Sequence, residues 1–288
     1  MEWWKALILG LVQGFTEFLP VSSSGHLVLF QAWLNVESES ILFFDVMLHV
    51  ATLVAVCIVL YKEIWALLKK PLSKPVLFLI IATIPAGIVG ITLEDVVGGF
   101  FEGTKYLWIF FLLSAAVLLL SDIMSKKYAQ KDIVGANGAN KQSEQEANLQ
   151  QQINAPLFSS LNYGNVVAMG LAQACAIFPG LTRSGSTIAA GVIAKGDRKD
   201  VAKFSFLMSI PIILASALLQ GIKLGVNKTP IDVGAGSIII GMIAATVSGY
   251  FAVKWMLKLV QKCKLKWFSL YLVIIAIVVF INNFVKIW

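Results

Sequence analysis

The chain has 288 residues, of which 58% are hydrophobic and only 14% charged, and its mean hydropathy is +0.81. Soluble domains carry about 25% charged residues, so this composition excludes a water-soluble protein and predicts an all-α, polytopic membrane protein. The net charge of +7 is expected in loops at one membrane face rather than at a nucleic-acid surface, and no nucleic-acid partner is expected.

The first apolar segment, residues 3–36, is broken in its middle. A helix needs about 20 residues to cross the hydrocarbon core, but residues 3–19 run into Pro20 and a Ser/Gly-rich turn, and residues 25–36 are too short to cross. Broken helices are tolerated at membrane depth only where protein or a wet cavity surrounds them. We therefore predict a re-entrant helix–loop–helix hairpin, with no signal peptide. Three transmembrane helices follow and complete a first repeat, residues 1–122: 41–61, 76–93 and 106–121.

A polar stretch rich in Gln, Asn, Ala and Glu covers residues 123–156. Its composition is typical of a flexible linker, to which we assign no chemistry. The second repeat, residues 157–288, then follows the plan of the first. It contains a second re-entrant hairpin at 161–194 and three more transmembrane helices at 204–222, 234–256 and 267–285.

The two hairpins resemble each other in sequence. At one constant offset, several residues of the first hairpin align with identical or similar residues of the second: Gln13 with Gln173, Phe18 with Phe178, Ser22 with Thr182, Ser24 with Ser184, and Gly25 with Gly185. Each half contains an odd number of crossings, so the second half begins on the opposite side of the membrane. The sequence therefore predicts an inverted-topology repeat, in which the hairpin tips meet near the middle of the membrane.

Most of the 23 lysines and arginines fall in segments on the side opposite the amino terminus: 62–74, 126–141, 195–203 and 254–266. Cytoplasmic loops of membrane proteins are enriched in Lys and Arg. We therefore predict that this side, including the linker, is cytoplasmic and that both termini lie outside.

The second hairpin tip carries Arg183, one of two arginines in the chain. A guanidinium at membrane depth is costly without an anionic partner, and its planar fork suits phosphate or carboxylate. It is either an ion-pair partner of Glu17 or a phosphate clamp that also contacts Glu17, and we favour the clamp. The hydroxyls of Thr182, Ser184 and Thr187 and the start of the following helix would favour the same anion.

The first tip carries reactive groups. Gln13 and Glu17 are four residues apart and share a helix face, and Glu17 is suited to hold a divalent cation or to orient a water. A serine and His26 at this spacing can act as nucleophile and general base, or His26 can attack phosphorus itself. Serines alone equally serve to pack membrane helices.

A further acid and histidine, Asp45 and His49, are four residues apart at the start of the first transmembrane helix. The sequence leaves open whether they line a cavity with the two tips or have a purely structural role. Together, the polar groups of the tips fit a diphosphate on a lipid, because phosphoryl transfer depends mainly on positioning and charge neutralisation.

Two motifs carry a family resemblance. Residues 13–26, QGFTEFLPVSSSGH, resemble the (Glu/Gln)-x-x-x-Glu motif of the undecaprenyl-diphosphate phosphatases, the bacitracin-resistance proteins, with its Pro-Val-Ser-Ser-x-Gly-His extension. Residues 179–187, PGLTRSGST, resemble the family's Pro-Gly-x-Ser-Arg-Ser-x-x-Thr motif. The resemblance covers almost the whole chain outside the linker.

This resemblance implies a bacterial plasma-membrane enzyme that hydrolyses undecaprenyl diphosphate to undecaprenyl phosphate and inorganic phosphate. That reaction recycles the carrier lipid for cell-wall synthesis. The resemblance also implies a site open to the outer face and a divalent cation, Mg²⁺ or Ca²⁺. Homodimer formation stays open, and a transporter or flippase of prenyl phosphate lipids is the alternative function.

By position in the motifs, the resemblance also assigns roles. Glu17 becomes the essential acid and metal ligand, Arg183 the diphosphate clamp, and Ser23 and His26 the nucleophile and its helper. The nucleophile itself is left open between Ser23, His26 and water. The remaining motif residues are expected to bind substrate: Gln13, Ser22, Ser24, Thr182, Ser184 and Thr187.

Overall fold

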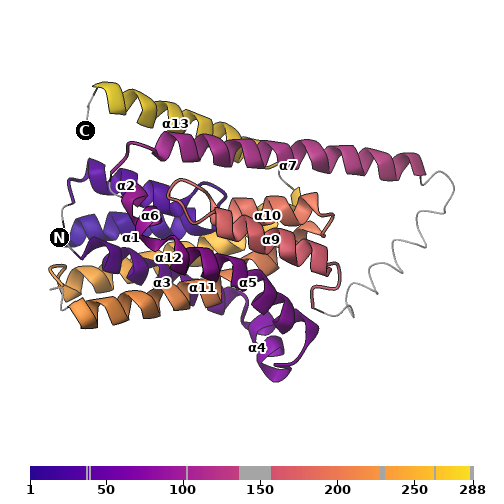
Figure 1. The fold of residues 1–288 in the computed structure, drawn as a ribbon, viewed down its shortest axis with the longest axis horizontal. Helices are drawn as coiled ribbons and strands as arrows, with labels where there is room; N and C mark the ends of the chain where they lie inside the picture. Colours follow the sequence, from indigo (N-terminus) through magenta and orange to yellow (C-terminus); the bar gives the residue numbers. More distant parts are fainter. Residues whose placement is uncertain are drawn as a thin grey trace.

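The computed structural model describes residues 1–36, 38, 40–101, 103–135, 157–227, 231–262 and 264–285, and every regular element in these ranges is a helix (Figure 1). The first half contains α1 (Trp3–Phe18), α2 (Ser23–Trp33), α3 (Ile41–Val59), α4 (Tyr61–Lys69), α5 (Lys74–Thr92), α6 (Glu94–Phe101) and α7 (Leu107–Gly135). The second half contains α9 (Tyr163–Cys175), α10 (Arg183–Ile193), α11 (Arg198–Asn227), α12 (Ala235–Lys262) and α13 (Lys266–Val285).

The all-α membrane fold predicted from the sequence is confirmed. Six described helices, α3, α5, α7, α11, α12 and α13, are long and apolar enough to cross a membrane, which indicates a multi-pass membrane protein. Their outward faces are apolar. On α5, for example, Leu77, Ile80, Ile84 and Ile88 are all exposed at helical spacing, as expected of side chains that face lipid.

Two features of the chain differ from the sequence-based expectation. The helix expected at 106–121 continues to Gly135, so residues 123–135 are helical and not flexible linker. No proline or glycine interrupts the chain between Leu107 and Gly135, and residues such as Lys126 and Ala129 favour helix. The rest of the expected linker, 136–156, lies outside the described residues. The short helices α4 and α6 were not predicted.

Both predicted hairpins consist of two helices joined by a tight turn. Helix α1 ends before Leu19, whose backbone is extended at φ −73° and ψ 147°, because the following proline disfavours helical geometry. Ser22 and Thr182 then cap the second helix of each hairpin, accepting hydrogen bonds from the N–H groups of Gly25 and Gly185 at 3.3 and 3.1 Å. The insertion of these hairpins into a membrane from opposite faces stays a prediction.

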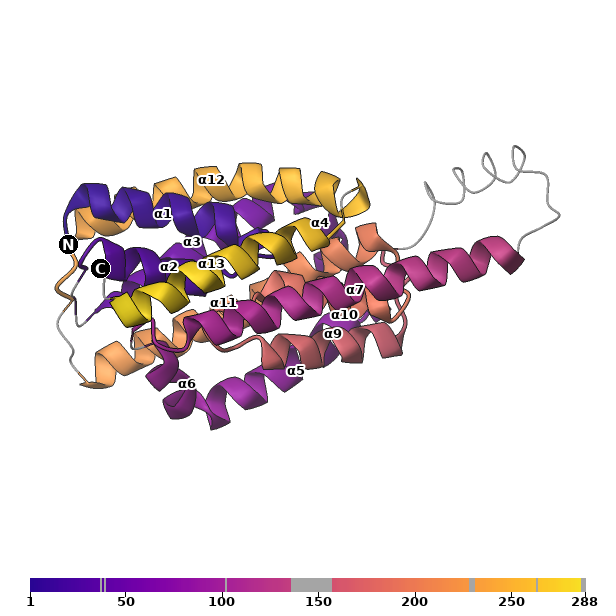
Figure 2. The ribbon, with the colours of Figure 1, turned by 90° about the horizontal axis from the view of Figure 1, so that it is seen from above.

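The two halves pack reciprocally. Helix α1 packs on α12 of the second half, and its counterpart α9 packs on α5 of the first half (Figure 2). Gly10 and Gly170, which align at the constant offset, both make close backbone approaches to the opposite half. A Cβ at Gly10 would lie 2.2 Å from the Gly241 carbonyl oxygen, and one at Gly170 would lie 2.8 Å from that of Ala82. Each hairpin is therefore held against a transmembrane helix of the other half.

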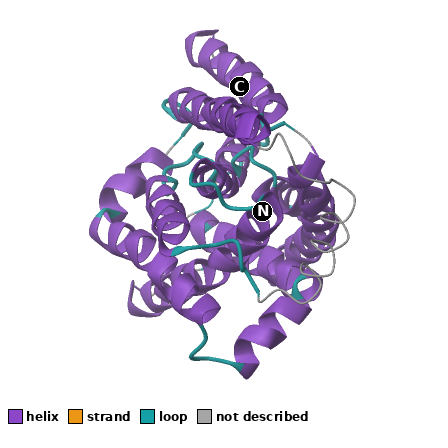
Figure 3. Ribbon diagram, turned by 90° about the vertical axis from the view of Figure 1, so that its right-hand side faces the viewer, coloured by secondary structure: helices purple, strands orange, loops and turns teal. Residues whose placement is uncertain are grey.

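The core lies between these helices, and its largest fully buried side chains are phenylalanines and leucines. Phe18, at the end of α1, is fully buried and packs edge-on against Phe206 of α11, with ring centroids 5.4 Å apart. Helices α7 and α13 pack against each other along one edge of the bundle, which Figure 3 shows end-on. The packing of Phe18 against Phe206 fixes the tip of the first hairpin deep inside the bundle.

Candidate active site

A cavity of about 430 Å³ lies between the two hairpin tips. At one end its lining is polar, with Glu17, the serines of residues 22–24, His49 and Arg183. Elsewhere its walls are mostly apolar and come mainly from α5, α6 and α11. The cavity is therefore suited to an amphipathic ligand with a compact polar group.

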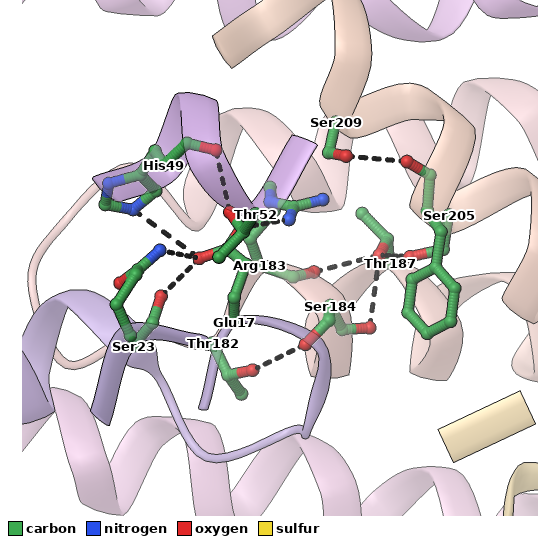
Figure 4. A network of polar contacts seen from close by, with 12 residues as sticks. Glu17, Ser23, His49, Thr52, Thr182, Arg183, Ser184, Thr187, Ser205 and Ser209 are labelled. Carbon is green, nitrogen blue, oxygen red and sulfur yellow. Dashed lines mark hydrogen bonds and ion pairs between the residues drawn. The ribbon is translucent and has the colours of Figure 1, made fainter. Parts of the chain in front are cut away.

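The Glu17 carboxylate is the centre of the polar end (Figure 4). Its side chain is only 4% exposed. Oε1 accepts from Arg183 Nη2 at 2.5 Å, and Oε2 accepts from Gln13 Nε2 at 3.0 Å and from Ser23 Oγ at 2.6 Å. Oε2 also lies 3.5 Å from His49 Nε2. One buried carboxylate thus connects both hairpins and α3, and these donors offset the cost of burying its charge.

Arg183 comes from the first residue of α10, which places its guanidinium at the tip of the second hairpin. One of its terminal nitrogens, Nη2, pairs with Glu17. The other, Nη1, is buried and has no hydrogen-bond partner. Arg183 also lines the cavity, so this wall carries one residue with both an ion pair and an unused donor. This is the arrangement expected of an anion clamp that also contacts Glu17.

Ser23 stands at the start of α2, directly after a residue in a strained conformation. Ser22 has φ +67° and ψ 95°, a backbone geometry that is unfavourable for a non-glycine residue and recurs at functional sites. The strained turn presents the Ser23 hydroxyl to Glu17 and brings Ser24 to the cavity wall. The first N–H groups of α2 have no partner within the helix and add a partial positive charge there.

The hydroxyls of the second tip contribute unequally to the cavity. Thr182 lines it, whereas Ser184 and Thr187 do not. Ser184 Oγ donates to the Leu19 carbonyl at 3.0 Å and so ties the second tip to the first. Thr187 Oγ1 bonds Ser205 Oγ at 2.6 Å. Both hydroxyls therefore bond to protein groups and lie outside the cavity lining, and their expected contact with substrate stays a prediction. Gln13 likewise supports Glu17 without lining the cavity.

The structure does not bring His26 to this polar cluster. Its Nδ1 donates to the Ser22 carbonyl at 2.7 Å, and its Nε2 accepts from the Tyr271 hydroxyl at 2.8 Å. The ring also stacks on Tyr271, with centroids 5.8 Å apart. The bond to the preceding turn rotates the imidazole toward α13. In this geometry both ring nitrogens of His26 bond to groups other than Ser23 and Glu17, so the expected role of His26 as a direct helper of Ser23 stays a prediction.

His49 is the imidazole that faces Glu17. Its Nδ1 donates to the Asp45 carbonyl at 2.7 Å, which orients Nε2 toward the carboxylate. Asp45 and His49 both line the cavity, so the cavity-lining alternative left open by the sequence is the one observed. Asp45 accepts a hydrogen bond from Gln31 Nε2 at 2.7 Å.

Sequence reasoning missed two contributors to the site. Ser114 of α7 donates to the Gly180 carbonyl at 3.0 Å and accepts from Thr182 N–H at 2.9 Å, which fixes the second tip. Gln173, near the end of α9, lines the cavity. Its alignment with Gln13 was a usable signal, whereas a lone serine in an apolar helix gives none.

The described residues hold no group of three His, Cys, Asp or Glu side chains that would form a cation site by themselves. Mg²⁺ sites, however, commonly use one or two carboxylates together with phosphate oxygens and waters. The donor set here fits a cation that arrives with a phosphate ligand, with Glu17 as its carboxylate.

Comparison with known proteins identifies the family of this chain. A family model described as bacitracin resistance protein BacA matches residues 6–278. An undecaprenyl-diphosphatase of Bacteroides fragilis is 40% identical to this chain, covering 96% of the chain and 97% of that protein. One from Methanobrevibacter smithii is 38% identical, with 97% of both proteins covered. Undecaprenyl-diphosphatase 3 of Bacillus cereus is 36% identical, with 100% of both covered.

Proposed function

The chain belongs to the family of the bacitracin resistance protein BacA, and we propose that it is an undecaprenyl-diphosphatase. It hydrolyses undecaprenyl diphosphate to undecaprenyl phosphate and inorganic phosphate, returning the carrier lipid to cell-wall synthesis. The observation that carries this proposal is the cavity, which has largely apolar walls and is lined by an arginine with a buried, unused donor.

The polar end suits a diphosphate headgroup. Arg183 Nη1 supplies a charged donor, and the amino-terminal ends of α2 and α10, which begin at Ser23 and Arg183, both lie at this end. Helix amino termini favour phosphate because their free N–H groups and their dipoles both attract negative charge. Ser24 and Thr182 add hydroxyls at the same wall.

The remaining walls suit a polyprenyl chain. Ile91 of α5, Phe101 of α6 and Leu219 of α11 face the cavity. Burial of apolar surface stabilises a complex by about 25 cal/mol per Å², so a long isoprenoid tail contributes much of the binding. The headgroup interactions then hold the phosphates, where the bond is cleaved.

We assign the nucleophile to Ser23. Its oxygen attacks the terminal phosphorus, the bond to the bridging oxygen breaks, and undecaprenyl phosphate leaves with that oxygen. The hydroxyl proton passes to Glu17 Oε2, which already accepts it at 2.6 Å, and from there to the departing phosphate. Water then attacks the phosphoserine and gives its proton to Glu17, which returns it to Ser23 as phosphate leaves. His49 supports Glu17 in place of the expected His26.

A divalent cation, Mg²⁺ or Ca²⁺, is part of the proposal. Glu17 would be its protein ligand, and the diphosphate would supply further oxygens. When bound, the cation would neutralise negative charge on the phosphates. Arg183 and the two helix termini provide the protein's own share of that neutralisation.

We infer that the cavity lies in the outer half of the membrane. Several lining residues, including Leu42, Gly90 and Leu219, lie near those ends of α3, α5 and α11 that adjoin the side of the amino terminus. Figure 1 shows the start of α1 and the end of α13 at that end of the bundle. Because the basic loops are concentrated at the opposite end, the positive-inside rule makes the cavity side external.

Purified protein supplied with undecaprenyl diphosphate in detergent micelles tests the function. The proposal expects release of inorganic phosphate, measured colorimetrically, and loss of release in the Arg183→Ala variant. A prenyl-phosphate transporter would bind the lipid without releasing phosphate. Absence of release from folded parent protein, with and without added Mg²⁺ or Ca²⁺, would overturn the proposal in favour of transport.

A further inference from the structure

Two residues of the cavity wall carry buried polar atoms that lack partners. Within the described part of the chain, such side-chain atoms are Gln13 Oε1, Ser121 Oγ, both polar atoms of Gln173, and Arg183 Nη1. Gln173 and Arg183 line the same cavity, whereas Gln13 and Ser121 do not. Gln173 is only 2% exposed, and neither end of its amide is satisfied.

An unsatisfied buried amide has a desolvation cost that folding does not recover, and buried polar groups in folded proteins are therefore almost always paired. The exceptions need an explanation, and a binding cavity supplies one. A ligand that brings an acceptor to Gln173 Nε2 and to Arg183 Nη1 would satisfy both donors together. A phosphate group has several acceptor oxygens with the required charge.

The repeat shows what Gln173 lacks. Gln13, its counterpart in the first half, donates from Nε2 to the Glu17 carboxylate four residues later. The residue four positions after Gln173 is Ile177, which aligns with Glu17 at the same offset. Both residues line the cavity. The second half thus keeps the amide donor but lacks the anion that satisfies it in the first half.

The packing of α9 against α5 fixes the position of the helix that carries Gln173. Gly170, one turn before Gln173, lies against the backbone of Ala82 so closely that a Cβ there would be 2.8 Å from the Ala82 oxygen. Gly10 holds α1 against α12 in the same way, one turn before Gln13. Both glutamine side chains are therefore carried by helices whose positions are set by backbone contact, which favours a preorganised binding group.

We propose that Gln173 is a further substrate-binding residue, whose side-chain amide donates to a phosphate oxygen of the bound diphosphate. The phosphate is then the acceptor for Gln173, as the Glu17 carboxylate is the acceptor for Gln13. The Oε1 atom then accepts from water in the filled cavity. This inference rests on the proposed phosphatase function and extends its headgroup site. The substrate-binding part of the cavity then includes the end of α9 as well as the two tips.

The test replaces Gln173 by methionine, which keeps the length of the side chain and removes both hydrogen-bonding atoms. Loss of one hydrogen bond to a charged group corresponds to about a tenfold to hundredfold lower kcat/KM, and we expect Gln173→Met to show this loss in phosphate release. Gln173→Glu, which places a negative charge beside the phosphate, should lose more. Ser121→Ala, which removes the partnerless hydroxyl outside the cavity, is the matched control and should keep parental activity.

Thermal unfolding in detergent separates binding from a structural role. Removal of an unsatisfied amide should leave the Tm of Gln173→Met equal to or above that of the parent, and the addition of inorganic pyrophosphate should raise its Tm less than the parent's. Parental kcat/KM in Gln173→Met would overturn the inference, as would a fall in Tm that parallels the loss of activity. Failure of the proposed function itself would look different, because the parent protein would then release no phosphate.

Discussion

The close contact between α1 and α12 predicts that Gly14→Ala displaces the first hairpin. A Cβ at Gly14 would lie 2.0 Å from Ser248 Oγ and 2.5 Å from the Ala245 carbonyl oxygen. The serine side chain can rotate, but the backbone oxygen cannot yield without moving a helix. Since ordinary contacts to carbon begin near 3.5 Å, α1 must shift by roughly 1 Å. Glu17 lies one turn further along the same helix and would move with it.

The expected effects are large enough to measure. Overpacking of this kind costs about 1–3 kcal/mol, which lowers Tm by about 2–10 °C in a chain of this size. Misplacement of a catalytic group by about 1 Å can cost a hundredfold in rate, so kcat/KM for phosphate release should fall by about that factor. Differential scanning fluorimetry and a phosphate assay measure the two effects on one preparation.

Gly221→Ala provides the matched control. Gly221 lies in α11, where a Cβ would meet no atom within 4 Å. Alanine favours helix over glycine by up to about 1 kcal/mol, so this variant should be at least as stable as the parent and equally active. Unchanged Tm and full activity in Gly14→Ala would refute the reasoning that backbone contact with α12 positions Glu17.

Three further predictions concern the site itself. Ser23→Ala should lower kcat/KM by about 10³-fold or more at unchanged Tm, since it removes the proposed nucleophile while leaving the charges in place; recovery of most activity would point to water as the nucleophile. Tyr271→Phe leaves a buried His26 acceptor unpaired, so unfolding in a thermal scan should become about 1–3 kcal/mol easier, with less than a tenfold loss of kcat/KM. A loss in Tyr271→Phe as large as that in Ser23→Ala would return His26 to the chemistry. Chelation by EDTA should abolish phosphate release, and added Mg²⁺ or Ca²⁺ should restore it; full activity in EDTA would remove the cation from the mechanism.

The sequence was sufficient for the six long apolar helices and for a contact between Glu17 and Arg183. Apolar runs long enough to cross a bilayer leave few alternatives to a transmembrane helix. Likewise, Glu17 and Arg183 at membrane depth each need a partner, and the structure pairs them at 2.5 Å. The constant offset between the halves is also visible in space, where Gly10 and Gly170 make equivalent contacts with the opposite half.

The sequence could not indicate which imidazole faces the cavity. His26 belongs to the motif, but the rotation of its ring depends on the Ser22 carbonyl and on Tyr271, which is distant in sequence. His49 reaches Glu17 only because α3 packs beside α1. The orientation of these two imidazoles depends on tertiary packing, which local patterns do not encode. The end of α7 differs for a local reason: its polar composition is typical of a linker, but polar residues such as Lys and Gln also favour helix.

The central claim is that the two hairpin tips form one anion site through Glu17 and Arg183. A double-mutant cycle on kcat/KM for phosphate release tests it most directly, using Glu17→Ala, Arg183→Ala and the double variant. Residues that act as a unit are strongly non-additive, so the account predicts that the double variant loses no more activity than the worse single variant. If the two single losses multiply in the double variant, the tips act independently and the account is contradicted.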